Sequence, residues 1–205
     1  MIIDVSKLNG QHVYLRELDE EHIPILKSLA KDARLWEFTK SLIINDSFDA
    51  QFERYITIAL SPNGDSTFSV GVQKTFVIFN KADDAIIGMT RFYGLDEKQK
   101  RVDIGYTWYV PEVWGMVYNK ECKFLLLQYV FDVLKFNRAG FHVAHINIRS
   151  QKAVEKIGGV KEGVLRKHSY QPDGSMRNTV LYSILDDEWE VVKERLLQMI
   201  NESVV

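Results

Sequence analysis

The clearest hydrophobic pattern in the chain is an alternation between residues 101 and 110. Apolar or aromatic residues stand at every second position: Val102, Ile104, Tyr106, Trp108 and Val110. The positions between them are mostly polar or small: Arg101, Asp103, Gly105, Thr107 and Tyr109. Because successive side chains of a strand point to opposite faces, the pattern predicts a strand with one apolar face. Pro111 then ends the strand, since proline cannot donate to a sheet ladder.

Residues 119–135 form the most hydrophobic predicted helix. Its apolar residues make two stripes, Phe124, Leu127, Phe131 and Leu134 in one and Leu126, Val130 and Val133 in the other. A helix that is apolar on two sides is buried, so we expect it to pack against a sheet. A strand is predicted next, at 140–146. The helix is then a crossover, which places strands 101–110 and 140–146 parallel and nearly adjacent.

Weaker patterns account for the rest of the chain. Apolar spacing predicts helices at 19–30, 48–60, 150–157 and 187–201, and strands at 12–17, 74–79, 85–92, 163–171 and 176–184. Turns are expected at Asp83-Asp84 and at Gln171-Pro172-Asp173-Gly174, and a surface loop at 60–66. The expected fold class is α/β (α+β): one domain, residues 1–205, with helices flanking a mixed, mostly antiparallel sheet.

Composition narrows the function classes without naming one. The 205 residues include 26 Lys and Arg against 28 Asp and Glu, a net charge of −2, so a net basic surface for nucleic acid is absent. The single Cys122 excludes a disulfide framework, and its apolar neighbours predict a core position. No apolar run of about 18 residues and no signal-peptide pattern is present. We therefore expect no nucleic-acid partner, no membrane partner and a cytoplasmic location.

Metal chemistry is not expected either. One cysteine cannot build a multi-cysteine site. His142 and His145 stand three apart on a predicted strand, so they point to opposite faces and cannot hold one ion together.

The turn between strand 101–110 and the buried helix is the first candidate binding site. Free backbone N–H groups and the positive end of the helix dipole face outward from such a turn, which suits a phosphate group. An ordinary strand-to-helix turn, with Asn119 as its N-cap, explains the same residues. Spacing alone leaves both interpretations open.

Short motifs, each weak by itself, follow one another in a fixed order. They are Val13-Tyr14-Leu15-Arg16, Ile86-Ile87-Gly88, Thr90-Arg91-Phe92, Asp103-Ile104-Gly105-Tyr106, Trp114-Gly115 through Asn119-Lys120-Glu121, Asn147-Ile148-Arg149-Ser150 with Ala153 and Gly158, Glu162-Gly163-Val164-Leu165-Arg166, Asp173-Gly174 and Glu188-Trp189. Together they resemble the GNAT superfamily of N-acetyltransferases, and within it the branch that acetylates the N-termini of ribosomal proteins at alanine or serine. The resemblance implies that strands 101–110 and 140–146 splay around a coenzyme site.

The resemblance implies acetyl-CoA as cosubstrate and no metal. The implied coenzyme-binding residues are Tyr109, Val110, Trp114, Gly115, Met116, Val117, Tyr118, Asn119 and Asn147. The family's loop pattern is (Gln/Arg)-x-x-Gly-x-(Gly/Ala), and Trp114, Val117 and Asn119 stand at its three defined positions. Val117 thus replaces a glycine. A β-branched residue disfavours positive φ, so this position departs from the family where the backbone approaches the diphosphate.

The mechanism implied by the resemblance is direct attack of a neutral amine on the thioester. Ser150 is implied as the hydroxyl that protonates the leaving thiolate, and it also stands where a helix N-cap is expected. A backbone N–H near Val110 is expected to stabilise the oxyanion. Asn147 is expected to hold the coenzyme arm or the loop before the helix.

Asp103 is implied as the general base, and a solvated strand carboxylate is the alternative for it. Glu112 and Glu162 are weaker candidates, and a water chain without a dedicated base stays open. His168, on a late strand, is expected at the substrate cleft, with a structural role as the alternative.

The acceptor implied by the branch is a protein or peptide N-terminal α-amine. A small amine, such as a polyamine or an aminoglycoside, is the runner-up, and acids at Asp46, Asp49, Glu53 and Asp65 would suit a polycation if they converged. A non-catalytic coenzyme A-binding module with the same fold is the alternative from another class, supported by Val117. A homodimer formed through a late edge strand is also an option.

Overall fold

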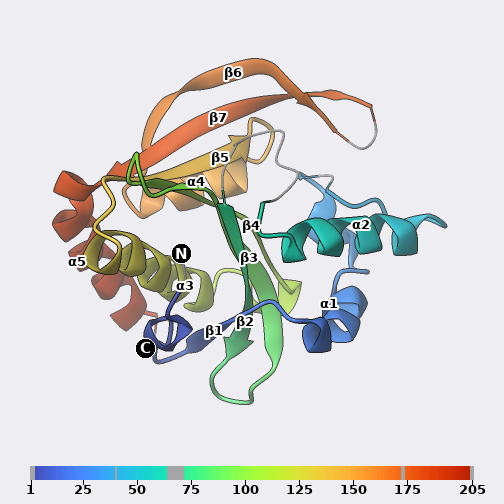
Figure 1. Ribbon diagram of the computed structural model, residues 1–205, viewed down its shortest axis with the longest axis horizontal. Helices are drawn as coiled ribbons and strands as arrows, with labels where there is room; N and C mark the ends of the chain where they lie inside the picture. The colour runs from blue at the N-terminus through green and yellow to red at the C-terminus, as the bar shows by residue number, and fades with distance from the viewer. Residues whose placement is uncertain (1–2, 40, 64–71, 172–173, 204–205) are drawn as a thin grey trace.

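The computed structural model describes residues 3–39, 41–63, 72–171 and 174–203. These form one seven-stranded sheet with helices on both faces, in the order β1-β2-β3-β4-β5-β7-β6 (Figure 1). The strands are β1 Val13–Glu17, β2 Val72–Asn80, β3 Ile86–Asp96, β4 Arg101–Tyr109, β5 Arg138–Ala144, β6 Val160–Tyr170 and β7 Met176–Leu185. The helices are α1 Ile23–Leu29, α2 Phe48–Leu60, α3 Tyr118–Gln128, α4 Ile148–Lys156 and α5 Trp189–Asn201. Every strand and helix predicted from the pattern is present; α2 has the predicted bounds, and most other elements are shifted at one or both ends.

The predicted crossover is confirmed, and it makes the one parallel pair among the described strands. β4 and β5 pair over three positions only, Arg101 to Asp103 against Arg138 to Gly140. Beyond these, β4 continues to Tyr109 and β5 to Ala144 without pairing to each other. The sheet therefore opens between the two strands, as expected for 101–110 and 140–146.

Two hydrophobic clusters hold the sheet, one on each face. The cluster on the side of α3 and α5 includes Ile104, Leu126 and Trp189, and the cluster on the side of α1 and α2 includes Phe52 and Trp108. Figure 1 shows the same division, with α3 and α5 on one side of the central strands and α1 and α2 on the other. Cys122 is fully buried in the first cluster, which confirms its core position.

The predicted faces of β4 are wrong in the second half of the strand. Tyr106 has a positive φ of 51°, and the β3–β4 register shifts between Met89 and Arg91. This irregularity adds a residue to β4, so the alternation inverts. Ile104 lies in the α3 cluster, whereas Trp108 lies in the α1–α2 cluster.

Several predicted helix ends also move. The long helix predicted at 119–135 is α3 followed by a π-helical stretch, Tyr129–Val133. Helix α4 begins two residues before the predicted start, at Ile148. Residues 64–66 of the predicted loop and 172–173 of the predicted turn lie outside the described residues.

The β6–β7 hairpin forms one edge of the sheet and arches over the remaining strands (Figure 1). Strand β6 is mostly exposed, with Val160, Val164 and Leu165 open to solvent. In the part of the chain that the structure describes, no helix is long and apolar enough to cross a membrane.

Candidate functional site

The loop that ends β4 presents a row of unused backbone donors. It runs from Val110 through a short 3₁₀ turn, Pro111–Val113, to the start of α3. Among the described residues, five consecutive or nearly consecutive N–H groups have no acceptor within the protein: those of Gly115, Val117, Tyr118, Asn119 and Lys120. Unsatisfied donors at a helix N-terminus, together with the helix dipole, form an anion-binding site.

Val117 does not obstruct this arrangement. It is the N-cap residue of α3, with φ −67° and ψ −28°, and it makes no side-chain capping bond. The positive φ of the loop lies at Gly115 instead, at 81°, where an added Cβ would meet nothing within 4 Å. The conformational demand that favours glycine has therefore moved by two residues. The alternative that Asn119 caps the helix is wrong, because Asn119 lies inside the first turn.

Trp114 connects the loop to both sides of the opening. Its indole N–H donates to the carbonyl oxygen of Tyr109, the last residue of β4, at 2.7 Å. The guanidinium of Arg149, at the start of α4, lies 4.0 Å from the centre of the Trp114 ring. The loop and the α4 N-terminus thus flank the same opening.

Asn147, and not Ser150, caps helix α4. Asn147 is the N-cap of α4, and its side-chain oxygen accepts the Ser150 N–H at 3.0 Å. The alternative that Ser150 caps the helix is therefore wrong. Within the described residues the Ser150 hydroxyl makes no hydrogen bond, and the side chain is partly exposed in the first turn of α4.

The N–H of Val110 itself is not free to stabilise an oxyanion. The Val110 N–H donates to the Ile87 carbonyl at 2.9 Å, so it belongs to the β3–β4 ladder. The Tyr109 side chain is buried in the α3 cluster, and only its backbone can face the opening.

Asp103 lies at the closed end of the opening, on the last residue of β4 that pairs with β5. Burial raises the pKa of its carboxyl to about 6, against the opposing effect of Arg138 and Arg101. The carboxylate faces the Gly140 backbone, where an added Cβ would lie 2.1 Å from Oδ1. Glycine at this position of β5 makes room for the acid.

His142 is a candidate site residue that the sequence predicted only to be unable to share a metal ion with His145. It stands on β5 two residues beyond Gly140, and its Nε2 lies 3.9 Å from Asp103 Oδ2, too far for a hydrogen bond. Burial lowers the pKa of the imidazole, and Arg177 and Arg138 lower it further. The signal available in the sequence was its position on the strand facing Asp103 across the opening.

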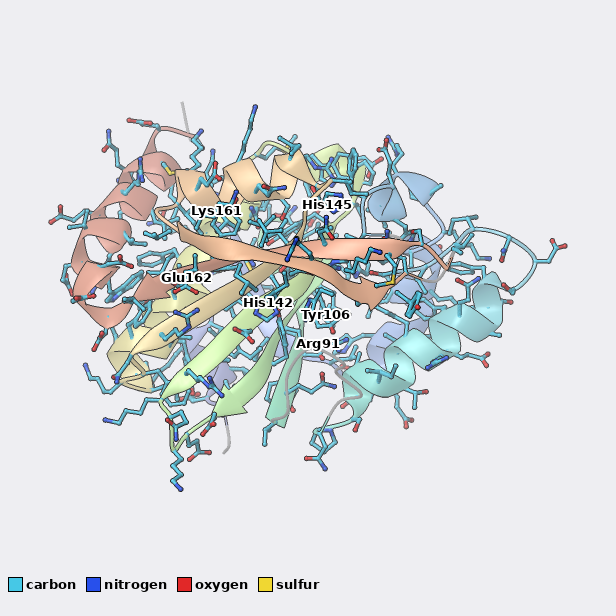
Figure 2. All side chains as sticks on the ribbon, turned by 90° about the horizontal axis from the view of Figure 1, so that it is seen from above. Arg91, Tyr106, His142, His145, Lys161 and Glu162 are labelled. Carbon is cyan, nitrogen blue, oxygen red and sulfur yellow. The ribbon has the colours of Figure 1, made fainter. Side chains whose placement is uncertain are left out.

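His168 lies on β6, partly buried. Burial lowers its pKa first, and the nearby His142 and Arg177 lower it further. The β6 strand thus brings His168 into the same electrostatic neighbourhood as His142. Figure 2 shows His142 and Tyr106 close to each other, near the middle of the β6–β7 hairpin.

The weaker base candidates are engaged elsewhere. Glu162 forms an ion pair with Arg138 and accepts the Ser183 hydroxyl at 2.9 Å. Glu112 lies on the surface, 3.3 Å from Arg34.

The acids considered for a polycationic acceptor include Asp49 and Asp65. Asp49 pairs with Lys27 at 3.2 Å, and Asp65 lies outside the described residues. Among the described residues, no group of three His, Cys, Asp or Glu side chains could hold a metal ion.

Comparison with known proteins gives one consistent family. The model of the acetyltransferase (GNAT) domain matches residues 12–160. The uncharacterized N-acetyltransferase YoaA of Bacillus subtilis is 36% identical over 100 residues, 49% of this chain and 55% of YoaA. YdaF of the same organism, named as a candidate ribosomal N-acetyltransferase, is 33% identical over 109 residues, 53% of this chain and 58% of YdaF. The matched part therefore spans little more than half the length of these two relatives.

The fold is matched over a greater length. A crystal structure of a candidate acetyltransferase from T. thermophilus superimposes with a TM-score of 0.79 at 30% identity. The match covers 94% of this chain and 96% of that chain.

Proposed function

This chain belongs to the GNAT acetyltransferase domain family, and on that premise we propose that it is an acyltransferase that moves an acetyl group from acetyl-CoA to a primary amine. The observation that carries the proposal is the row of five unused N–H groups from Gly115 to Lys120. A diphosphate is the part of acetyl-CoA that such a row fits, because its oxygens accept several backbone donors at once.

The residues present fit the coenzyme at three places. The loop from Trp114 to Asn119 would hold the diphosphate by its backbone, so the identity of Val117 matters little. Asn147 fixes the start of α4 on the other side of the opening. The unpaired parts of β4 and β5 leave backbone groups free for the extended arm between them.

Asp103 is the proposed general base. The amine nitrogen attacks the thioester carbonyl, a C–N bond forms, the C–S bond breaks, and the amine proton passes to the carboxylate. A base whose pKa is near the working pH transfers protons best, and the Asp103 pKa of about 6 is closer to neutrality than that of an ordinary carboxyl. Ser150, whose hydroxyl is uncommitted, is the proposed proton donor to the leaving thiolate.

The acceptor that we propose is an N-terminal α-amine. An α-amine has a pKa of about 7.7–8.0, against about 10.4 for lysine, so much of it is already neutral near pH 7.5. Such an amine needs only a weak base. The similarity to YdaF, named as a candidate ribosomal N-acetyltransferase, supports the same choice. His168 is the proposed acceptor-side residue on β6.

Two alternatives remain beside it. A small-amine acceptor, such as a polyamine or aminoglycoside, uses the same chemistry. A non-catalytic coenzyme A-binding module rested on Val117, and that argument is weakened because Val117 has an ordinary helical φ of −67°. A homodimer through the exposed edge strand β6 would be visible by sedimentation.

The proposal is tested by calorimetric titration with acetyl-CoA, followed by thiol release with peptide and small-amine acceptors. We expect micromolar binding, and thiol release that falls in Asp103→Asn and Ser150→Ala while their coenzyme binding stays unchanged. No binding up to millimolar acetyl-CoA would reject coenzyme use. Binding without thiol release from any amine would favour the non-catalytic module.

A further inference from the structure

Arg91, in the middle of strand β3, is a buried cation with no anionic partner in the part of the chain that the structure describes. Its exposed fraction is 1%. Its guanidinium lies 4.2 Å from the centre of the Tyr106 ring and 6.0 Å from that of Tyr55. Among the described residues it forms no ion pair, and of its three nitrogens only Nη1 has a hydrogen bond, to Gln73 Oε1 at 3.1 Å. Nε and Nη2 are buried and unsatisfied.

This arrangement is costly for the folded chain. A buried charge is ordinarily paired, because the free energy lost on leaving water is not regained without an oppositely charged partner. Burial lowers the pKa of Arg91, in keeping with that cost, and the nearby groups that partly offset it are tyrosines rather than carboxylates. The aromatic rings contribute some cation–π stabilisation, but they cannot satisfy two N–H donors that lie in the guanidinium plane.

The unsatisfied edge is the one that suits a carboxylate. Gln73 is itself held in place, since its amide nitrogen donates to the carbonyl oxygens of Ile58 and Ser61 at the end of α2. It therefore occupies Nη1 and leaves Nε and Nη2 as an adjacent pair. Two parallel N–H groups on a planar guanidinium bind both oxygens of a carboxylate at once.

Arg91 is also placed beside the opening of the sheet. Tyr106, on which it stacks, is on β4 three residues beyond Asp103, where pairing with β5 has ended. Contact with Tyr55 places the guanidinium on the α2 side, across the sheet from α3. Figure 2 shows Arg91 next to Tyr106, with His142 on the neighbouring strand β5.

Arginines outnumber carboxylates around this region. Arg91 and Arg177 both act electrostatically on Tyr93, against Asp103. Arg177 and Arg138 also lower the pKa of His142, and Glu162, which pairs with Arg138, opposes them. Among the described residues that these interactions name, three arginines therefore face two carboxylates. Such a field attracts an anion and disfavours a polycation.

We propose that Arg91 binds a carboxylate of the acceptor, so that the amine to be acetylated belongs to a molecule with an acidic group close to it. The inference rests on the proposed function and narrows its substrate class. The acidic amine can be a free acidic amino acid or the first residue of a peptide that begins with aspartate or glutamate. Arg91 is 1% exposed and lies against the Tyr106 ring, so we expect the carboxylate to reach it only when that ring shifts.

The first experiment separates this proposal from catalysis. Two pairs of products are titrated into the protein in the presence of CoA. The free pair is N-acetyl-aspartate and the neutral N-acetyl-asparagine amide. The peptide pair is a short peptide that begins with N-acetyl-aspartate and the same peptide beginning with N-acetyl-asparagine. In at least one pair, we expect the acidic product to bind at least about tenfold more tightly than the neutral one. The pair with the larger difference tells whether the acceptor is a free amino acid or the start of a peptide. Equal affinity for the acidic and neutral products overturns the proposal, whether or not acetyl-CoA binds. Failure of acetyl-CoA to bind rejects the proposed function instead.

The second experiment uses Arg91→Met and Arg91→Lys. Arg91→Met removes an unpaired buried charge and keeps an apolar stem, so it is expected to fold with a melting temperature at least that of the wild type. We expect it to lose the preference for acidic over neutral acceptors in kcat/KM while its acetyl-CoA affinity is unchanged. Arg91→Lys is expected to keep part of the preference, because it retains the charge without the paired donors.

A purely structural role of Arg91, holding Tyr106 in place, predicts a different result. Thiol release would then fall by the same factor for acidic and neutral acceptors in both variants. That outcome, or an acid preference that survives in Arg91→Met, rejects the proposed carboxylate site.

Discussion

Two sets of backbone N–H groups lie near helix α3, and one of them donates to a carboxylate of the protein whereas the other has no acceptor among the described residues. The first set, at Gln11, His12 and Val13, donates three bonds of 2.7 Å to the carboxylate of Glu121 on α3. The second set, from Gly115 to Lys120, has no acceptor among the described residues. Glu121 is 3% exposed, so the first anion is part of the fold. The comparison teaches that this chain fills an anion site where it needs structure, and leaves one open where we propose that it binds coenzyme.

Removing the internal anion should give the largest effect. In Glu121→Gln an amide NH₂ group replaces one carboxylate oxygen. This group cannot accept a hydrogen bond, so at least one of the backbone N–H groups of Gln11, His12 and Val13 loses its acceptor. We expect the free energy of unfolding to fall by about 3 kcal/mol or more. Urea denaturation measures it, with Glu112→Gln on the surface as the matched control. A loss below about 0.5 kcal/mol would mean that Glu121 is not what joins β1 to α3.

Removing one donor from the open site should come next. Val117 has φ −67°, which proline adopts, so Val117→Pro deletes the N–H with little change of backbone angle. We expect acetyl-CoA to bind about 10–100-fold more weakly, since a hydrogen bond to a charged group contributes about 1.5–3 kcal/mol. Val117→Ala, which keeps the N–H, is the control. Similar affinity in both variants would show that the backbone donors do not hold the coenzyme.

Asp103 extends the comparison to a partly buried carboxylate without N–H donors, since within the described residues it accepts no hydrogen bond. Its pKa is raised in the folded state to about 6, so the folded protein holds a proton that the unfolded chain releases near pH 4. Stability should therefore fall as the pH rises from about 4 to 6. Asp103→Asn should stabilise the protein by about 1–3 kcal/mol at pH 7.5 and have little effect at pH 4. Urea midpoints at both pH values test this, and a destabilised variant at pH 7.5 would contradict it.

The smallest effect is expected from restoring glycine in the loop. Because Val117 already has a helical φ, Val117→Gly gains no backbone freedom that the bound state needs. We expect acetyl-CoA affinity to change by less than about twofold and stability to fall by about 0.5–1 kcal/mol. Calorimetry and thermal unfolding check the two quantities. A tenfold gain in affinity would restore the importance of the family's glycine position.

The sequence predicted the elements of the fold well because periodicity reports which face is buried. It also predicted the β4–β5 crossover, since the apolar helix between them has one way to pack. It failed on the second half of β4, where the irregularity at Tyr106 inverts the faces. A single inserted residue leaves no mark in the hydrophobic pattern, because both faces of this strand are buried by helices.

The candidate site divides in the same way. The row of unused N–H groups in the turn could be predicted, because free backbone donors depend on where a helix begins. The capping role of Asn147 and the unsatisfied N–H groups of Arg91 could not be predicted. The surroundings of Arg91 depend on contacts between distant segments. Arg91 pairs with Gln73 of β2 and stacks on Tyr106 of β4, and no local pattern places these three together.

The short pairing between β4 and β5 has a consequence for the sheet as a whole. A sheet ordinarily has two free edges, but this one has four, because the ladder stops after Asp103 and Gly140 and both strands run on. The two inner edges expose peptide groups that face each other inside a single chain. An extended molecule with amides of its own can form hydrogen bonds with these peptide groups, as an added strand would, so that binding would pair backbone groups that the folded chain leaves unpaired.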